Sequence, residues 1–348
     1  MTMFTPRYTL TDPLLTNIRK IGEMVGELNS KSISKTIFLT LERKARVLSS
    51  FSSNKIEGNP LSLTDVKDIL KNSPQNLRNT QKEIFNYNKA LIYLNGKISN
   101  GEKRKISNKL VCKVHSIVTK STISKSLSGV YRKDAVFVNN PLNGETIYWP
   151  PDVADVKVLM RDLVNFVNKS SGNIDPIILA GIFHKQFVVI HPFMDGNGRS
   201  ARLLSSFILS ELKMNPFSLF SFEKYYNKNV SKYFQKVGVV GNYYDIVENM
   251  DFTDWLEYFV EGILDELSRV KKELPQYNER LQPHQKKIVQ YLRDYGSISS
   301  SEYYKISKRA RSTRIKDFRI LMNRNIIKAI GKGKSTYYIL SDEYSCFT

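Results

Sequence analysis

The segment from His191 to Arg202, with the sequence HPFMDGNGRSAR, constrains the fold of this 348-residue chain most strongly. Apolar residues recur at helical spacing both before and after this segment, which predicts two buried helices joined by a short polar loop. A loop held between two buried helices is a place where functional side chains can be fixed. We therefore expect a mainly α-helical fold that is organised around this loop.

The loop has the residue types of a phosphate-binding site. Glycines allow successive backbone N–H groups to turn inward, so Gly196, Asn197 and Gly198 predict an anion site at the start of the second helix. Arg199 and Arg202 are three residues apart and therefore share a helix face near that site.

Two further residues of the loop suggest chemistry rather than binding alone. Asp195 would repel a bare phosphate, but a single carboxylate beside phosphate oxygens is the usual environment of Mg²⁺. His191 lies on the entering side, where an imidazole can accept a proton near neutral pH. The alternative is an ordinary corner between two helices, which needs neither the histidine and aspartate nor two arginines in register.

These twelve residues resemble the signature of the Fic family, HPFxDGNGRxxR, with every fixed position matched. Members of that family mostly transfer AMP from ATP to a protein hydroxyl. The resemblance implies that His191 deprotonates a target Tyr, Thr or Ser, and that Asp195 carries Mg²⁺ between the α- and β-phosphates. The phosphate ligands that it implies are Gly196, Asn197, Gly198, Arg199 and Arg202, with both arginines on the outer phosphates.

A second motif lies upstream, at Ser53-x-x-x-Glu57-Gly58. By itself this stretch is also typical of a helix end, with Gly58 after the last turn and Pro60 as a stop. It resembles the inhibitory motif of Fic proteins, which implies that Glu57 pairs with Arg202 and removes it from the γ-phosphate. A partly buried pair of arginine and carboxylate is strong enough for this role.

Residues 134–150 change character, because β-forming residues surround Asn143-Gly144, which is a strong hairpin signal. One interpretation is a surface hairpin that shields the helical core. Its Gly-x-x-Arg lead-in and Tyr-x-Pro-Pro exit also resemble the family's flap, which positions the target as an added strand. The flap residues are then Val136, Phe137, Val138 and Asn139.

Other candidate residues flank the loop. Gln186 is expected to face the nucleotide, and Tyr243 and Asn249 approach the adenine by analogy with the family's closing helices. Most of the aromatic residues in that region are expected to be core. We expect His184 and His115 to be packed or to cap a helix, with no catalytic part.

The C-terminal residues 283–348 predict three short helices and two strands around Gly-Lys-Gly, the pattern of a winged helix-turn-helix. This segment holds 14 Lys and Arg against five Asp and Glu, a footprint expected for phosphate contact with DNA through residues 308–334. The alternative is a winged helix that binds protein. The basic residues concerned are Lys308, Arg309, Arg311, Arg314, Lys316, Arg319, Lys332 and Lys334.

The composition of the chain limits the kinds of partner and the cellular location that can be expected. The formal net charge of +20 favours an anionic partner, although a lysine-rich composition alone also explains it. No apolar stretch approaches the roughly 20 residues of a membrane span, and the N-terminus has no signal-peptide pattern, which predicts a cytoplasmic protein without a membrane partner.

The prediction is a Fic-type helical bundle with three parts: a helical region with the inhibitory motif at 1–105, a catalytic core at 106–274, and a winged helix at 283–348. The predicted function is a self-restrained protein adenylyltransferase that uses ATP and Mg²⁺ and modifies a protein, including itself. The alternatives are a DNA-binding regulator that senses nucleotide, or removal of AMP in the same pocket. The implied pairing of Glu57 with Arg202, by which the protein blocks its own ATP site, is also compatible with a homodimer.

Overall fold

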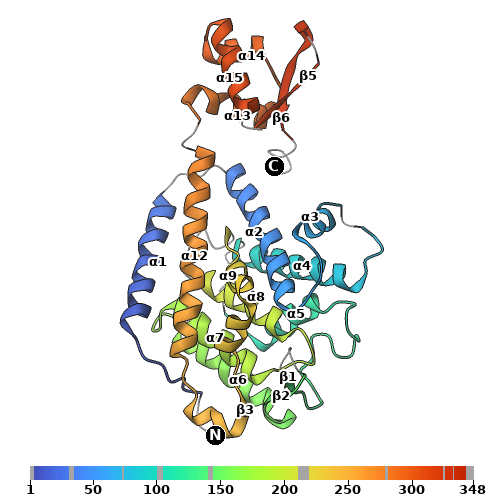
Figure 1. The fold of residues 1–348 in the computed structure, drawn as a ribbon, viewed down its shortest axis with the longest axis vertical. Helices are drawn as coiled ribbons and strands as arrows, with labels where there is room; N and C mark the ends of the chain where they lie inside the picture. The colour runs from blue at the N-terminus through green and yellow to red at the C-terminus, as the bar shows by residue number, and fades with distance from the viewer. Residues whose placement is uncertain are drawn as a thin grey trace. The chain divides into compact units, whose positions relative to one another are not determined.

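The computed structural model describes residues 4–30, 35–72, 74–99, 105–139, 144–210, 219–278, 281–323, 326–331 and 333–341. It is mainly helical, as the sequence predicts (Figure 1). The chain divides into two compact units, of which the first comprises residues 1–31 and 45–268 and the second residues 32–44 and 269–348. The division expected between residues 105 and 106 does not coincide with a boundary between these units.

The first four helices are α1 (Asp12–Ser30), α2 (Lys35–Ile56), α3 (Leu63–Asn72) and α4 (Asn79–Ser99). Helix α2 ends in a tight turn at Glu57 and Gly58, whose backbone adopts φ 86°. The N–H groups of Glu57 and Asn59 both donate to the carbonyl oxygen of Asn54, so this turn is closed by backbone hydrogen bonds. Glycine reaches such a left-handed conformation without strain, which explains why the helix ends there.

Four helices form the centre of the first unit: α5 (Asn108–Val118), α6 (Val153–Ser170), α7 (Pro176–Ile190) and α8 (Asn197–Leu209). Helix α7 packs against α6 and α8, and α4 and α5 pack against α8. Helix α7 is apolar and buried around nearly its whole circumference, as expected for a central helix. The contacts of α4 with α5 and α8 explain why a boundary near residue 105 separates no compact unit.

A small sheet lies beside these helices. Strands β1 (Val138–Asn139) and β2 (Thr146–Trp149) pair antiparallel, with Val138 opposite Tyr148. These are the two strands of the predicted hairpin, although Asn143 of its turn lies outside the described residues. A third strand, β3 (Gly241–Asn242), pairs parallel with β2 and gives the order β1-β2-β3, which the sequence did not indicate.

The remaining elements of the core are α9 (Glu223–Lys228), α10 (Val230–Val237), α11 (Tyr243–Ile246), the 3₁₀ turn η3 (Val247–Asn249) and α12 (Thr253–Asn278). Helix α12 continues past the expected end at Pro275 to Asn278. As expected, the aromatic residues of this region pack mainly with one another in the core, around a cluster of Tyr226, Tyr233, Trp255, Tyr258 and Phe259.

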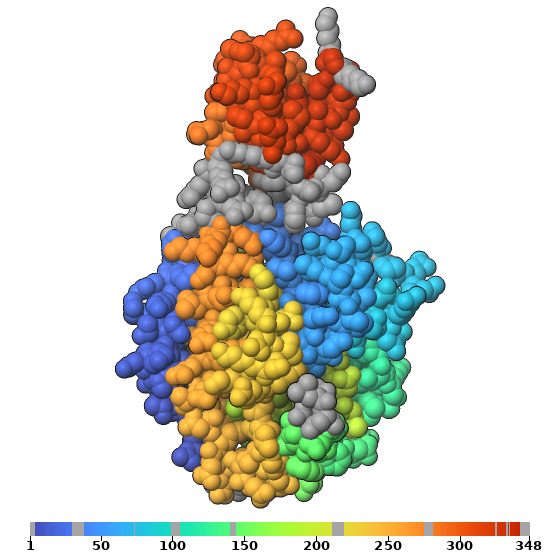
Figure 2. All heavy atoms as spheres, viewed as in Figure 1, coloured from blue at the N-terminus to red at the C-terminus, as the bar shows by residue number. Residues whose placement is uncertain are grey.

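The C-terminal part contains α13 (Pro283–Tyr295), β4 (Ile298–Ser299), α14 (Ser300–Ser307), α15 (Arg311–Asn323), β5 (Ile327–Ile330), the 3₁₀ turn η4 (Gly333–Ser335) and β6 (Tyr337–Leu340). Its strands form an antiparallel sheet in the order β4-β6-β5. The atoms of this part, orange to red in Figure 2, pack closely together. Its own buried core comprises Leu281, Ile288, Val289, Leu292, Ile298, Tyr303, Phe318, Leu321, Ile326, Ile327 and Leu340.

No helix within the described ranges has both the length and the apolar character of a membrane span.

A glycine in α7 allows a close approach to α12 and gives a test of the packing. A methyl group at Gly181 would lie 2.6 Å from Leu256 Cδ2 and 3.1 Å from Phe259 Cδ1. We expect Gly181→Ala to lower the free energy of unfolding by about 1–3 kcal/mol through overpacking. Urea denaturation followed by tryptophan fluorescence measures this.

Gly22→Ala is the matched control, because no atom lies within 4 Å of its methyl group on α1. It should raise the free energy of unfolding by roughly 0.5–1 kcal/mol, since alanine favours a helix over glycine. Equal effects of the two substitutions would contradict the packing of α7 against α12.

Candidate active site

His191 begins the loop directly after α7 and adopts a left-handed backbone conformation with φ 49°. A conformation that is unusual for a non-glycine residue often occurs at functional sites. Its Nδ1 atom lies 3.2 Å from the carbonyl oxygen of Val188. Because a carbonyl only accepts, Nδ1 carries the proton and the lone pair of Nε2 is left for other chemistry.

Burial lowers the pKa of His191, and it outweighs the hydrogen bond to Val188, which acts in the opposite direction. The imidazole is therefore neutral at neutral pH, as a general base must be.

The turn that follows is shaped by Gly196 and Asn197. Gly196 caps the N-terminus of α8 with φ 76°. The side chain of Asn197 accepts from the N–H of Phe193 at 2.9 Å and donates to its carbonyl oxygen at 2.8 Å. The amide of Asn197 thus closes the loop, and what the turn offers an anion is the set of N–H groups at the start of α8.

His115 in α5 joins two loops. Its Nδ1 accepts a hydrogen bond from the N–H of Gly129 at 2.8 Å, so its Nε2 carries the proton and donates to the carbonyl oxygen of Asp195 at 2.8 Å. The ring stacks on Phe193 at 3.6 Å. Burial lowers the pKa of His115 to about 4, so it stays neutral and packed, in agreement with the expectation.

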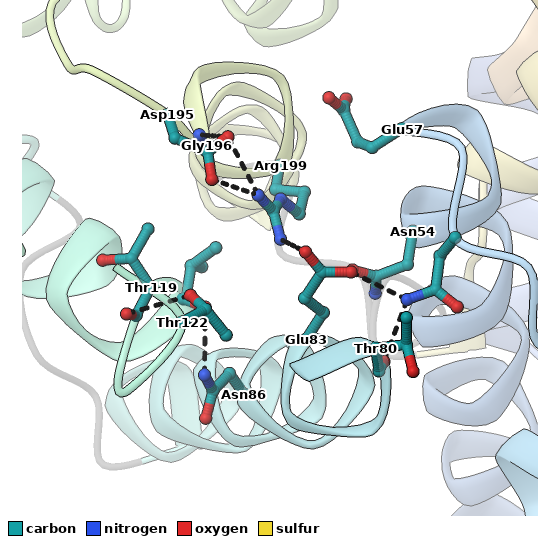
Figure 3. A network of polar contacts seen from close by, with 12 residues as sticks. Asn54, Glu57, Thr80, Glu83, Asn86, Thr119, Thr122, Asp195, Gly196 and Arg199 are labelled. Carbon is teal, nitrogen blue, oxygen red and sulfur yellow. Dashed lines mark hydrogen bonds and ion pairs between the residues drawn. The ribbon is translucent and has the colours of Figure 1, made fainter. Parts of the chain in front are cut away.

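Arg199 is almost fully buried, with 3% of its side chain exposed, and it lies between two carboxylates (Figure 3). Its Nη2 donates to both carboxylate oxygens of Asp195 at 3.1 Å. Its Nη1 lies 3.2 Å from Oε1 of Glu83 in α4. Nothing in the sequence pattern pointed to Glu83, which lies more than a hundred residues before the loop.

Arg202 is fully buried, and the structure brings it together with Ser53 and Glu57. Its Nε donates to Ser53 Oγ at 2.8 Å and its Nη2 to the carbonyl oxygen of Ser53 at 3.0 Å. Nη2 also donates to Glu57 Oε1 at 2.7 Å, and Nη1 donates to the hydroxyl of Tyr233 at 3.1 Å. Nε, Nη1 and Nη2 of this arginine are thus all engaged within the protein.

Gly198 and Gly58 allow Glu57 to reach this position. A methyl group at Gly198 would lie closer than 3.0 Å to Glu57 Oε1. The carboxylate of Glu57 therefore lies against the anion-binding turn, and its approach requires a residue without a side chain at position 198. Gly58, with its left-handed backbone, forms the turn that carries Glu57.

A buried arginine, Arg132, links the hairpin to the loop that begins at His191. The Nε of Arg132 donates to the carbonyl oxygen of His191 at 2.9 Å, and Nη2 donates to that of Pro151 at the far end of the hairpin. Its backbone N–H donates to Pro192 at 2.9 Å. In the sequence Arg132 is recognisable only as part of the Gly-x-x-Arg lead-in, and no local pattern indicates its contacts with the loop.

The predicted flap residues lie at one edge of the small sheet. Val138 and Asn139 form β1, and the partly buried Val136 and the exposed Phe137 precede it. Because β2 pairs with β1 on one side and with β3 on the other, the free edges of this sheet are the outer edges of β1 and β3, and the predicted flap residues lie at the first of them.

The residues expected near the nucleobase separate into two groups. Tyr243 is buried, and burial raises the pKa of Tyr243 to about 12. The Oε1 atom of Gln186 is buried without a hydrogen-bond partner in the described part of the chain. Asn249 is instead exposed, and its side chain accepts from Arg7 at 3.3 Å.

His184 is buried against Tyr233, with its Nε2 3.0 Å from the tyrosine hydroxyl, as expected for a packed histidine.

One carboxylate is available for a metal ion. Asp195 is half exposed, and its oxygens contact Arg199 and the N–H of Gly196. Within the described ranges no three His, Cys, Asp or Glu side chains cluster to hold an ion. A single exposed carboxylate fits Mg²⁺ that is bound mainly through substrate phosphates.

The basic residues of the C-terminal part have different surroundings. Arg309 lies 3.1 Å from the buried Asp317, and Arg314 donates to Ser300 and to the carbonyl oxygen of Arg309. Lys332 and the side chain of Lys334 lie outside the described residues. Of the eight basic residues that the sequence predicts to contact DNA, those exposed in the described part of the chain are Lys308, Arg311, Lys316 and Arg319.

Comparison with known proteins supports the similarity to one family. Residues 105–209 match the model of the Fic/DOC family. The chain is 30% identical over 208 residues to protein adenylyltransferase fic-1 of Caenorhabditis elegans, covering 57% of this chain and 39% of that protein. It is 27% identical over 194 residues to protein adenylyltransferase Fic of Aedes aegypti, covering 55% and 37%. The chain thus spans about two fifths of the length of these curated relatives.

Solved structures have a similar fold. A Fic family protein from Desulfovibrio desulfuricans has a TM-score of 0.67 at 19% identity, covering 97% of this chain and 98% of that one. Residues 134–508 of Fic-1 from Caenorhabditis elegans have a TM-score of 0.58 at 22% identity, covering 76% of this chain and 74% of that one.

The low pKa of His115 generates a prediction of pH dependence. The unfolded chain binds a proton on this ring below about pH 6.5, whereas the native ring stays neutral to about pH 4. Stability is therefore lost as the pH falls from 6.5 towards 4. Between pH 7 and 4.5 the wild-type protein should lose about 2–3 kcal/mol more than His115→Asn does.

Urea denaturation of both proteins at the two pH values measures the difference. The other three histidines are common to both proteins and cancel. Parallel losses of stability would show that His115 is not held neutral by the contacts with Gly129 and Asp195.

Proposed function

Because residues 105–209 match the model of the Fic/DOC family, we propose that this chain transfers AMP from ATP to a hydroxyl group of a protein. The curated relatives from Caenorhabditis elegans and Aedes aegypti are named protein adenylyltransferases, which supports the proposal. The observation that carries it is the loop His191–Arg202, where a neutral imidazole, an anion-binding turn and two buried guanidinium groups adjoin.

The proposed reaction uses the free lone pair of His191 Nε2. This atom takes the proton of the target hydroxyl while the hydroxyl oxygen forms a bond to the α-phosphorus of ATP. The bond from the α-phosphorus to the bridging oxygen of the β-phosphate breaks, and pyrophosphate leaves. Arg199 and Arg202 neutralise the departing pyrophosphate, which is where negative charge develops.

Asp195 would hold Mg²⁺ together with the phosphates of ATP, and the ion would neutralise phosphate charge. For this the carboxylate must turn from Arg199 to the ion, and its half-exposed position gives it room to do so.

The contacts of the same loop also suggest how AMP transfer is inhibited. We propose that Glu57 inhibits the enzyme, because it occupies Arg202 and lies against the turn at Gly198. A γ-phosphate and this carboxylate compete for the same guanidinium group and repel each other. ATP then binds in an unproductive position until Glu57 moves away.

The proposed target site is the free edge of β1. A segment of the target protein would pair with Val138 and Asn139 as an added strand and so bring its hydroxyl towards His191. Arg132 holds the flap and the catalytic loop in one arrangement through the carbonyl oxygens of His191 and Pro151.

A second candidate function concerns the C-terminal part, which we propose is a winged helix-turn-helix that binds DNA. Three helices precede the paired strands β5 and β6, as in that motif. Arg311, Lys316 and Arg319 are exposed on or beside α15, in the position expected of a recognition helix. In this role the nucleotide site would regulate DNA binding.

The AMP transfer can be tested by labelling with α-³²P-ATP and Mg²⁺. We expect Glu57→Gly to label itself at least 10- to 100-fold faster than the wild type. A charge-assisted hydrogen bond contributes about 1.5–3 kcal/mol, and each 1.36 kcal/mol corresponds to tenfold in rate. Adding His191→Ala to Glu57→Gly should reduce labelling by about 10²–10⁴-fold, because the base is lost.

Glu23→Gln on α1 is the control, since Glu23 is exposed and pairs only with Arg19 among the contacts described. It should label as the wild type does. If no variant becomes labelled, transfer of AMP is contradicted. If wild-type protein removes label from pre-labelled Glu57→Gly protein, the same pocket instead serves AMP removal.

DNA binding can be tested by gel shift at increasing salt. We expect the wild type to bind a DNA duplex, and the triple variant Arg311→Glu, Lys316→Glu, Arg319→Glu to lose about 10–100-fold in affinity. The slope of log affinity against log salt should fall by about 2.7, which is roughly 0.9 for each of three phosphate contacts.

The matched control is Lys20→Glu, Lys67→Glu, Lys71→Glu, which changes the net charge equally at exposed positions of α1 and α3. Equal losses by both triple variants would mean that net charge alone binds DNA, against a defined interface on α15.

A further inference from the structure

Glu83 connects the phosphate-binding arginine to the turn after α2. Its Oε1 lies 3.2 Å from Arg199 Nη1, and its Oε2 accepts a hydrogen bond from Asn59 Nδ2 at 2.7 Å. Figure 3 shows Glu83 extending from α4 towards Arg199, on the side of the guanidinium group away from Asp195. Asn59 itself is buried and immediately follows Glu57 and Gly58.

The guanidinium group of Arg199 is incompletely satisfied in this arrangement. Nη2 is bonded to Asp195, but Nη1 faces Glu83 at ion-pair distance without hydrogen-bond alignment. Its Nε is also buried without a hydrogen-bond partner in the described part of the chain. Buried donors of this kind are normally paired, so this group is suited to take further acceptor oxygens.

We propose that Glu83 is a positioning residue for Arg199, which it aims at the outer phosphates of ATP, and that Asn59 makes this aim depend on the turn Glu57–Asn59. The inference rests on the proposed use of ATP. When Asp195 turns to the metal and the phosphates, Arg199 loses its bidentate partner. Glu83 is then the carboxylate that still holds the guanidinium group from the other side.

Asn59 provides the link to the inhibitory turn. Its Nδ2 also donates to the carbonyl oxygen of Thr80 at 2.9 Å, and its N–H donates to that of Asn54 at 3.0 Å. Asn59 is therefore fixed both to the last turn of α2 and to the first turn of α4. A displacement of the whole turn Glu57–Asn59 would therefore break the contact of Glu57 with Arg202 and also remove the Asn59 donor from Glu83.

The two arginines of the loop are thereby connected to one short segment. Glu57 acts on Arg202 directly, and Asn59 acts on Arg199 through Glu83. A merely structural ion pair would fix α4 to α8 without regard to the number of phosphates on the nucleotide. A positioning residue affects only nucleotides that carry outer phosphates, and this difference decides between the two roles.

The experiment measures nucleotide binding by calorimetry with Mg²⁺, using AMP and an ATP analogue with a methylene bridge between the α- and β-phosphorus atoms. All proteins carry Glu57→Gly, so that the restraint on Arg202 is removed. The added substitutions are Glu83→Gln, Asn59→Ala, both together, and the control Glu23→Gln. Nucleotide binding does not depend on AMP transfer, so the positioning role of Glu83 is tested separately from the proposed transfer of AMP.

We expect Glu83→Gln to weaken binding of the ATP analogue about tenfold and to leave AMP binding within about twofold, and Asn59→Ala to weaken the analogue about threefold. The double variant should equal Glu83→Gln alone, because Asn59 acts through Glu83. Equal losses for AMP and the analogue, no loss for either, or additive losses would overturn the proposal. Failure of the Glu57→Gly protein to bind any nucleotide would overturn the proposed function as well.

Discussion

The charge of Arg202 is the constraint on which the rest of this site depends. A guanidinium group cannot be neutralised in a protein, and a fully buried one costs several kcal/mol unless acceptors surround it. Ser53 of α2, Glu57 of the turn after α2 and Tyr233 of α10 supply those acceptors. Of these, only Glu57 carries a compensating negative charge, and it is the partly exposed one. The arrangement therefore needs one anion at this position, and in the proposed function the γ-phosphate of ATP replaces the carboxylate of Glu57.

Other polar side chains of the site are also buried and paired with acceptors. Arg199 lies between Asp195 and Glu83, and Arg132 and His115 bind the flap and the loop through backbone carbonyl groups. His191 is thus held in one tautomer at a position that depends on several buried polar contacts. In the proposed function, inhibition and catalysis share these contacts, so a change of partner at Arg202 would alter the proposed outer-phosphate site while His191 stays in place.

Local sequence patterns predicted the helices around the loop, the strands of the hairpin, and the turn at Gly58, because each depends on nearby residues. Strand β3 was missed, since its pairing with β2 joins segments almost a hundred residues apart. Glu83 and Asn59 were missed for the same reason, because their contacts arise only when α4 packs on α8 and on the turn after α2. Asn249 was placed near the adenine by analogy, which stays a prediction, and no sequence pattern indicated that its side chain accepts a hydrogen bond from Arg7. The contact comes from Arg7 in the N-terminal segment, and nothing in the local sequence of that segment predicts it.

The most direct test of the central claim is the position of Arg202 in crystal structures with Mg²⁺ and a non-reactive ATP analogue, for the wild type and for Glu57→Gly. If Glu57 inhibits the enzyme, we expect Arg202 to keep its hydrogen bond to Glu57 in the wild type, with the γ-phosphate outside hydrogen-bond distance. In Glu57→Gly the guanidinium group should bind the γ-phosphate, and the α-phosphorus should face His191. A γ-phosphate bound to Arg202 in the wild type, with the pair to Glu57 intact, would contradict the account.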